Sequence, residues 1–207
     1  MTDAVKVVLL GDSGVGKTSI VQRFTFDKFK KDNPSTLGAM FIAKNFEVPE
    51  EGISMKFQIW DTAGQEKYRS LASMYYQDAA VAVLVYDITK KSTYEGLKTW
   101  LNEIKQKAPQ NIVIIIVANK SDLVEQEQVD FMEAKSYADN ENCRLRMTSA
   151  KDGTGIRELF LDIAHELNKG KPKVDGTPAL QAKDATKKKG VSLQDPNSTK
   201  KEKGGCC

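Results

Sequence analysis

Short apolar runs alternate along the chain with segments that place apolar residues on one helical face. Two runs, Ala80–Tyr86 and Ile112–Ala118, are almost wholly Val, Ile, Leu and Ala, the pattern of strands covered on both faces. A third run, Val5–Leu10, precedes a Gly-rich turn and then Lys17–Phe26, which contains no helix breaker. Buried strands that alternate with helices predict an α/β fold.

A hairpin is predicted near the middle of the first half. Phe41–Val48 and Met55–Trp60 flank Pro49-Glu-Glu-Gly52, and in the second run Phe57 and Ile59 alternate with polar residues. This alternation is typical of a strand with one buried face. The residues Glu47–Ser54 are expected to form a long loop between the two strands.

The remaining elements follow from helix signals. Ser92-Thr-Tyr-Glu95 is a capping box that predicts a helix start, and Asp130-Phe-Met-Glu133 predicts another. Arg144–Thr148 is a short strand, and the segment from Ile156 to Leu167 carries a 3.6-residue apolar stripe. Together these elements predict a doubly wound, mostly parallel six-stranded sheet with one antiparallel edge strand, in which ligands bind at the carboxyl ends of the strands.

Composition divides the chain of 207 residues in two. Residues 169–207 contain no Phe, Trp or Tyr, and their ten lysines against four acidic residues give a charge of +6; since the whole chain carries +3, residues 1–168 carry −3. We therefore expect a folded domain at 1–168 and a disordered basic tail at 169–207. No apolar run reaches the roughly 18 residues of a membrane-spanning helix, and no secretory signal begins the chain. Three cysteines exclude a disulfide framework and suit the reducing cytosol.

A phosphate-binding loop is the first chemical motif. Gly11-Asp-Ser-Gly-Val-Gly-Lys17-Thr18 fits G-x-x-x-x-G-K-[ST] and lies between a predicted strand and helix. Gly11, Gly14 and Gly16 supply the unusual backbone angles that let N–H groups surround a polyphosphate. Lys17 is expected to reach the β- and γ-phosphate oxygens, and the Thr18 hydroxyl to bind Mg²⁺.

A second motif selects the base. Asn119-Lys-Ser-Asp122 directly follows a buried strand, and a carboxylate at Asp122 would accept the N1 and 2-amino N–H groups of guanine, which adenine lacks. Asn119 would hold this loop to the phosphate loop, the Lys120 stem would lie along the ring, and Ser149-Ala150-Lys151 would offer a backbone N–H to the base oxygen.

A third motif bears on hydrolysis. Asp61-Thr-Ala-Gly64-Gln65 follows the Met55–Trp60 strand. Asp61 could bind Mg²⁺ through a water, Gly64 could turn its N–H to the terminal phosphate, and Gln65 could orient the attacking water because an amide both donates and accepts.

With these motifs in this order, residues 4–168 resemble the small Ras-like GTPases, whose P-loop GTPase fold has the predicted sheet. Phe57-Gln-Ile-Trp60-Asp61-Thr-Ala-Gly-Gln-Glu66, Tyr75-Tyr76 and Tyr86-Asp-Ile-Thr89 resemble the Rab branch. Ser35–Phe41 and Ser70–Tyr76 are most similar to the early-endosomal Rab group.

The resemblance implies roles that spacing alone does not. It makes Thr36 the second hydroxyl ligand of Mg²⁺, Phe29 the ring beside guanine, and Phe41, Trp60 and Tyr75 an aromatic effector patch. Thr36 could instead cap a turn, Phe29 could belong to the core, and Phe41 and Tyr75 could simply pack. The expected nucleotide-binding set is Ser13, Gly14, Val15, Gly16, Lys17, Thr18, Ser19, Phe29, Thr36, Gly64, Asn119, Lys120, Asp122, Ser149, Ala150 and Lys151.

The chain closes with Gly204-Gly-Cys206-Cys207, which resembles the double geranylgeranylation signal of Rabs. Two lipids anchor stably where one does not. The clusters Lys187–Lys189 and Lys200–Lys203 would add attraction to an anionic leaflet, or serve only as a solvated spacer. This implies the cytoplasmic face of intracellular membranes, with the early endosome expected, and a cytosolic form when extracted.

The leading hypothesis is a Mg²⁺-dependent GTPase that converts GTP to GDP slowly, since no arginine is suitably placed in the phosphate or Thr36 loops. The γ-phosphate would hold residues 33–41 and 62–76. The resemblance implies an exchange factor, a GTPase-activating protein, effectors, an escort protein and a GDP-dissociation inhibitor, acting on a monomer. A GTP-binding adaptor with little hydrolysis and a P-loop kinase are the alternatives. Nucleic acid is not expected, and with His165 and Cys143 alone in the domain neither is zinc.

Overall fold

The computed structural model describes residues 4–65 and 69–169. The predicted tail from residue 170 onward lies outside the described residues, as do Cys206 and Cys207. None of the helices within the described ranges has both the length and the apolar character needed to cross a bilayer.

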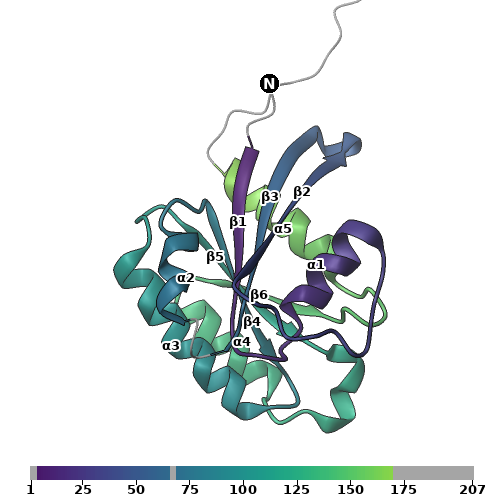
Figure 1. Cartoon of the computed structure of the whole chain (residues 1–207), viewed down its shortest axis with the longest axis vertical. Helices are drawn as coiled ribbons and strands as arrows, with labels where there is room; N and C mark the ends of the chain where they lie inside the picture. Colours follow the sequence, from purple (N-terminus) through teal and green to yellow (C-terminus); the bar gives the residue numbers. More distant parts are fainter. Residues whose placement is uncertain (1–3, 66–68, 170–207) are drawn as a thin grey trace, which may run out of the picture. The chain divides into compact units, whose positions relative to one another are not determined.

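A single six-stranded sheet forms the centre of the fold (Figure 1). Its strands are β1 (Ala4–Leu10), β2 (Ala39–Val48), β3 (Ile53–Thr62), β4 (Val81–Asp87), β5 (Val113–Asn119) and β6 (Arg144–Thr148). The spatial order is β2-β3-β1-β4-β5-β6, and all pairs are parallel except β2 with β3. The predicted sheet, with its one antiparallel edge strand, is confirmed.

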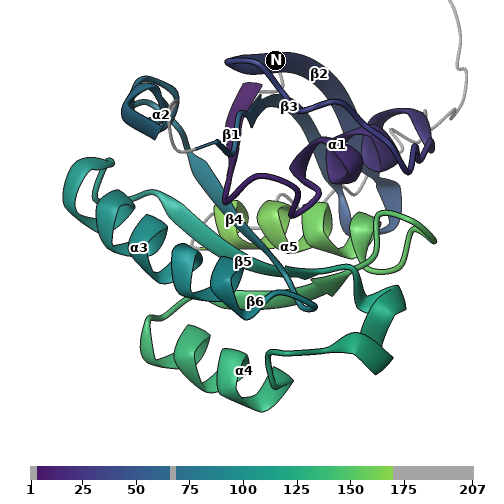
Figure 2. The same cartoon turned by 60° about the horizontal axis from the view of Figure 1, so that its bottom comes forward.

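Helices cover both faces of this sheet (Figure 2). The side chains of α1 (Lys17–Phe26) and α5 (Ile156–Asn168) pack on one face, and those of α2 (Arg69–Tyr76), α3 (Lys91–Lys107) and α4 (Phe131–Asn140) pack on the other. Two short 3₁₀ segments, η1 (Pro49–Glu51) and η3 (Ser121–Gln126), lie in the connections.

The central strand shows why its sequence is apolar at consecutive positions. In β1, Val7 and Leu9 belong to the core under α1 and α5, whereas Val8 and Leu10 belong to the core under α2, α3 and α4. Because successive side chains of a strand point to opposite faces, a strand covered on both sides needs apolar residues at every position.

One predicted helix start is wrong. The helix α3 begins at Lys91, and its N-cap residue Lys90 has no side-chain cap. Ser92 therefore lies inside the helix and not at its N-cap, and it is the neighbouring Thr93 hydroxyl that binds this turn, donating to the Lys90 carbonyl at 2.7 Å and accepting from the Asp87 N–H at 3.0 Å. The predicted start at Asp130 is confirmed, since its carboxylate accepts the Glu133 N–H at 2.9 Å.

The hairpin is longer, and its loop shorter, than predicted. Glu47 pairs with Ser54 and Val48 with Ile53, so the turn is confined to residues 49–52. Gly52 takes a φ of +66°, which closes this turn on the Pro49 carbonyl. Strand β2 therefore ends at Val48, as the run Phe41–Val48 predicts, and β3 begins at Ile53, two residues before the predicted start at Met55.

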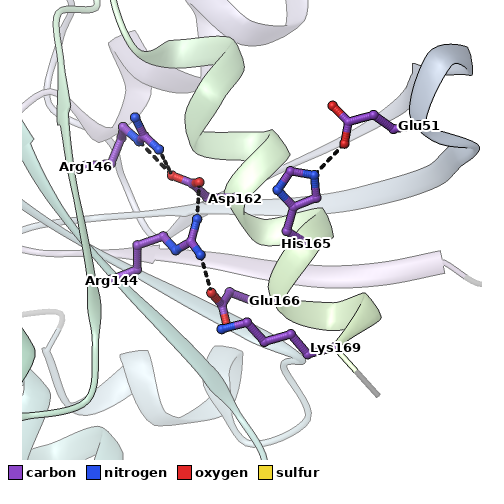
Figure 3. Close-up of polar contacts among 7 residues, drawn as sticks. All are labelled: Glu51, Arg144, Arg146, Asp162, His165, Glu166 and Lys169. Atoms are coloured by element: carbon purple, nitrogen blue, oxygen red, sulfur yellow. Dashed lines mark hydrogen bonds and ion pairs between the residues drawn. The ribbon is translucent and has the colours of Figure 1, made fainter. Parts of the chain in front are cut away.

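Polar contacts attach α5 to the rest of the fold (Figure 3). The buried carboxylate of Asp162 pairs with the guanidinium groups of Arg144 and Arg146 from the edge strand β6. One turn later, His165 Nε2 lies 2.6 Å from Glu51 Oε2 in η1. These contacts fix α5 against both the edge strand and the tip of the β2–β3 hairpin.

Candidate functional site

The sheet brings the sequence motifs to one place. The parallel strands β1, β3, β4, β5 and β6 all end at the same edge, here called the carboxyl edge. The phosphate loop follows β1, Asp61 and Asp87 close β3 and β4, and Asn119 closes β5. This is the position at which doubly wound sheets bind ligands.

The phosphate loop has the backbone that a polyphosphate requires. Gly11, Gly14 and Gly16 all have positive φ, as predicted. A Cβ at Gly16 would lie 2.3 Å from Asn119 Nδ2, so only glycine fits between these two loops. The loop leads directly into α1, whose first backbone N–H groups favour an anion.

Lys17 lies within this loop and is almost fully buried. Its ammonium donates to the carbonyl oxygens of Gly11 at 2.7 Å and Asp12 at 2.9 Å. Burial lowers the pKa of Lys17 to about 8, against the opposing pull of Asp61 and Asp12. A buried cation with only two carbonyl partners is well suited to an incoming phosphate.

Three side chains with oxygen atoms that could bind a metal ion, Thr18, Thr36 and Asp61, meet beside Lys17. The Thr18 hydroxyl donates to Asp61 Oδ2 at 2.5 Å and lies 2.8 Å from the Thr36 hydroxyl. The second oxygen, Asp61 Oδ1, is buried and has no hydrogen-bond partner among the residues that the structure describes, and burial raises the pKa of this carboxyl. A hard divalent cation such as Mg²⁺ prefers oxygen ligands of this kind. The residues present therefore fit Mg²⁺, which Thr18 and Thr36 would bind directly and Asp61 through water.

A cavity of about 170 Å³ opens next to these groups. It is lined by Ser13, Gly14, Gly16, Lys17, Thr18, Ser19, Lys31, Asn33, Pro34, Ser35, Thr36, Thr62 and Gly64. The segment before Thr36 is tied to α1 because Asn33 Nδ2 donates to Ser19 Oγ and to Gln22 Oε1, both at 3.2 Å. Asn33 falls within the segment 33–41 that the γ-phosphate is expected to hold, whereas Lys31 was not predicted to line the site and no motif spacing indicates it.

Gly64 lies against the phosphate loop. A Cβ there would fall 2.5 Å from both Lys17 Nζ and the Asp12 carbonyl oxygen. Only glycine allows this approach, which places the Gly64 backbone beside the ammonium of Lys17 and the phosphate loop. Gln65 follows immediately, so its amide lies within the same short segment.

Asn119 joins three segments at the other end of the site. Its Nδ2 donates to the Val15 carbonyl at 2.7 Å, and its Oδ1 accepts the Thr148 hydroxyl at 3.0 Å. The phosphate loop, β5 and β6 are thus held together by one buried amide.

The predicted base-binding residues gather beside Asn119. Asp122 Oδ1 accepts the Ser149 hydroxyl at 2.7 Å, and its Oδ2 lies 3.4 Å from Lys151 Nζ. Lys120, at a φ of +70°, forms an ion pair with Asp87 Oδ2 at 2.5 Å. Asp87 was not predicted. The sequence did offer a signal for Asp87, because an acidic residue directly follows the apolar run Ala80–Tyr86.

The aromatic residues fall into two groups. The rings of Phe41, Trp60 and Tyr75 form a continuous row, with centroids 5.4 Å and 5.5 Å apart, and Phe41 is half exposed. Phe29 lies elsewhere, at the rim of a hollow of about 550 Å³ that Phe26 also lines. The effector patch and the guanine-stacking role remain predictions.

All five arginines are engaged within the described residues. Arg69 pairs with Glu103 at 3.3 Å and lies over the Trp100 ring, whereas Arg157 lies over Phe46. Arg144 and Arg146 bind Asp162, and Arg23 donates to the carbonyls of residues 150 and 151. Arg23 was not predicted, because a contact across more than 120 positions leaves no local pattern.

Another hollow, of about 530 Å³ and thus larger than the cavity beside Lys17, lies between β6, α4 and α5, next to Cys143. Burial raises the pKa of the Cys143 thiol to about 11, as expected for a small core residue that is chemically inert.

Comparison with known proteins agrees with this geometry. The profile of the Ras family matches residues 6–169. The chain is 45% identical to Ras-related protein Rab-22A of Mus musculus over 179 residues, which cover 86% of this chain and 89% of the relative. It is 46% identical to the same-named protein of Canis lupus familiaris over 174 residues, which cover 84% and 87%.

Proposed function

The chain belongs to the Ras family, and we propose that it is a Rab-type GTPase that hydrolyses GTP to GDP and phosphate as a switch in endosomal trafficking. One observation supports the proposal: the residues expected to bind phosphate and those expected to bind the base lie together at the carboxyl edge of the sheet. Lys17, Thr18 and Thr36 form the expected phosphate side, and Asn119 and Asp122 form the expected base side.

Each residue would contribute a distinct part of the mechanism. Lys17 would exchange its carbonyl partners for β- and γ-phosphate oxygens, and the backbone N–H of Gly64 would meet the terminal phosphate. Gln65 would orient the attacking water. Mg²⁺, when bound, supplies positive charge to the phosphate oxygens. Loss of the γ-phosphate would release Thr36 and the Gly64 segment, which changes the surface that partners recognise.

Unaided hydrolysis is expected to be slow. Every arginine is engaged away from the phosphate loop, so the chain supplies no guanidinium of its own to the developing charge. A GTPase-activating protein that provides one would accelerate the reaction by roughly 10³ to 10⁵. An exchange factor, effectors, an escort protein and a GDP-dissociation inhibitor are the other partners that the proposal includes.

The direct test is the nucleotide content of the purified full-length chain. We expect about one bound guanine nucleotide per chain, exchange for labelled GTP in the presence of Mg²⁺, and single-turnover hydrolysis slower than about 10⁻² s⁻¹. ATP in excess should not compete. Protein that emerges empty and takes up no GTP at micromolar concentration would overturn the proposal, and equal competition by ATP would favour a kinase.

We further propose that prenyl groups on Cys206 and Cys207 attach the protein to the cytoplasmic face of early endosomes. Two chains give stable anchoring where a single chain binds marginally. An amino-terminally tagged full-length chain should colocalise with an early-endosome marker, and Cys206→Ser/Cys207→Ser should be diffuse in the cytosol. Equal membrane fractions of the two proteins would contradict this assignment.

A further inference from the structure

Arg23 connects α1 to the loop that is expected to read the base. Its Nε donates to the Ala150 carbonyl at 2.9 Å, and its Nη2 donates to the Lys151 carbonyl at 2.6 Å. The third nitrogen, Nη1, lies 2.9 Å from the Asp27 carboxylate. Hydrogen bonds from a charged donor in a fixed fork are stronger and more directional than neutral ones.

The two bonds fix the direction of a backbone donor. In a trans peptide the C=O and the following N–H point in opposite directions. Because Arg23 holds the Ala150 carbonyl towards α1, the N–H of Lys151 points away from α1. The next N–H, of Asp152, faces the Ser149 hydroxyl at 3.3 Å, and this hydroxyl also donates to Asp122. Arg23 therefore orients the side of the loop that Asp122 occupies.

The same helix contacts both ends of the site. Lys17 and Thr18 begin α1 at the phosphate loop, and Arg23 reaches the base loop from the second turn. Because one rigid helix contacts both the phosphate loop and the base loop, it sets the distance between these two loops. Residues 149–153, here called the base loop, also keep internal bonds such as Gly153 N–H to the Ser149 carbonyl at 2.9 Å. Those bonds shape the loop, but they do not tie it to α1.

We propose that Arg23 is a positioning residue that holds the base loop closed on the guanine, aims the Lys151 N–H at the base oxygen, and so sets how long GDP remains bound. This inference rests on the proposed function. It differs from a role in folding alone, because α1 is joined to α5 independently through the ring of Phe24, which stacks on Phe160. Loss of the guanidinium leaves that packing in place.

The test compares Arg23→Ala with Arg157→Ala in the full-length chain. Arg157 lines the same hollow as Arg23, but its guanidinium lies over the Phe46 ring 5.5 Å away. We expect Arg23→Ala to speed dissociation of GDP and of GTP by the same factor, about 10- to 100-fold, and Arg157→Ala to change it less than about twofold. Single-turnover hydrolysis of bound GTP should change less than about twofold, since the partners of the Arg23 guanidinium, Asp27 and the carbonyls of residues 150 and 151, do not line the cavity beside Lys17. Arg23→Lys should be intermediate because an ammonium lacks the fork.

Selectivity among bases distinguishes a role of Arg23 in positioning the base loop from a role in the stability of the fold. Inosine diphosphate lacks only the 2-amino group, which Asp122 is expected to read, whereas 2-aminopurine riboside diphosphate lacks the 6-oxygen and, with it, the N1–H. Arg23→Ala should reduce the preference for GDP over the second analogue several-fold and leave the preference over the first within about twofold. Equal weakening of all three nucleotides, or an unchanged residence time, would overturn the inference. Should Arg23→Ala not fold, Arg23→Gln takes its place in the same measurements. Failure of the wild-type chain to bind GDP would instead refute the proposed function.

Discussion

Replacement of Asp122 by Asn is expected to lower the affinity for GDP by at least about 10³-fold and to shift preference to xanthosine diphosphate. The carboxylate is mostly buried and accepts the Ser149 hydroxyl at 2.7 Å. An amide would place N–H donors opposite the donors of guanine and leave buried polar groups unpaired, a loss that sites built on hydrogen bonds do not tolerate. Xanthine has a carbonyl at C2 in place of the 2-amino group and would accept from that amide.

Competition between the two diphosphates for the nucleotide-free protein measures this shift. The matched control is Asp152→Asn, because Asp152 is exposed and its carboxylate accepts the Thr154 N–H at 2.9 Å. The control should keep the wild-type preference for GDP. An Asp122→Asn protein that still prefers GDP would show that another group reads the base.

Replacement of Gln65 by Leu is expected to leave the protein loaded with GTP. Leucine can neither donate to nor accept from the attacking water, so intrinsic single-turnover hydrolysis should fall by roughly 10- to 100-fold. The larger loss concerns activation: an acceleration of roughly 10³ to 10⁵ by an arginine-supplying activator should disappear almost completely. Both effects are measured by the release of labelled phosphate from protein preloaded with GTP.

The control for this measurement is Gln77→Leu, which changes an exposed glutamine just after α2. Its hydrolysis should equal that of the wild type, with and without the catalytic domain of a Rab-directed activating protein. If Gln65→Leu hydrolyses GTP at the wild-type rate, the water-positioning role is wrong, and an adaptor that barely hydrolyses GTP would show no difference among the three proteins.

Local pattern was enough to predict the sheet. Runs such as Ile112–Ala118 are buried on both faces, and polar residues at the ends of parallel strands must share an edge, so Asn119 could be placed near the phosphate loop before any geometry was known. The glycines at 11, 14 and 16 follow from the same logic, because a loop around phosphate needs positive φ.

Tertiary contacts account for what the sequence did not predict. The capping box at Ser92 satisfies the local rule, but α3 begins at Lys91, two residues before the start that a cap at Ser92 would give, and Thr93 bonds to Asp87 and Lys90 instead. Arg23 looked like an ordinary helical arginine, since its partners lie more than 120 residues away. Contacts of this kind depend on how α1 and the base loop meet in space, and hydrophobic periodicity carries no information about them.

The direction of α5 has a practical consequence. This helix begins near the carboxyl edge at Gly155, which packs against the Met147 carbonyl, and runs back for 13 residues, about 20 Å, to the edge where β1 begins. Strand β1 begins and α5 ends at the edge of the sheet opposite the carboxyl edge (Figure 1). A fluorophore coupled at Ala4 or Lys169 would therefore be separated from the loops of the carboxyl edge by the length of the sheet.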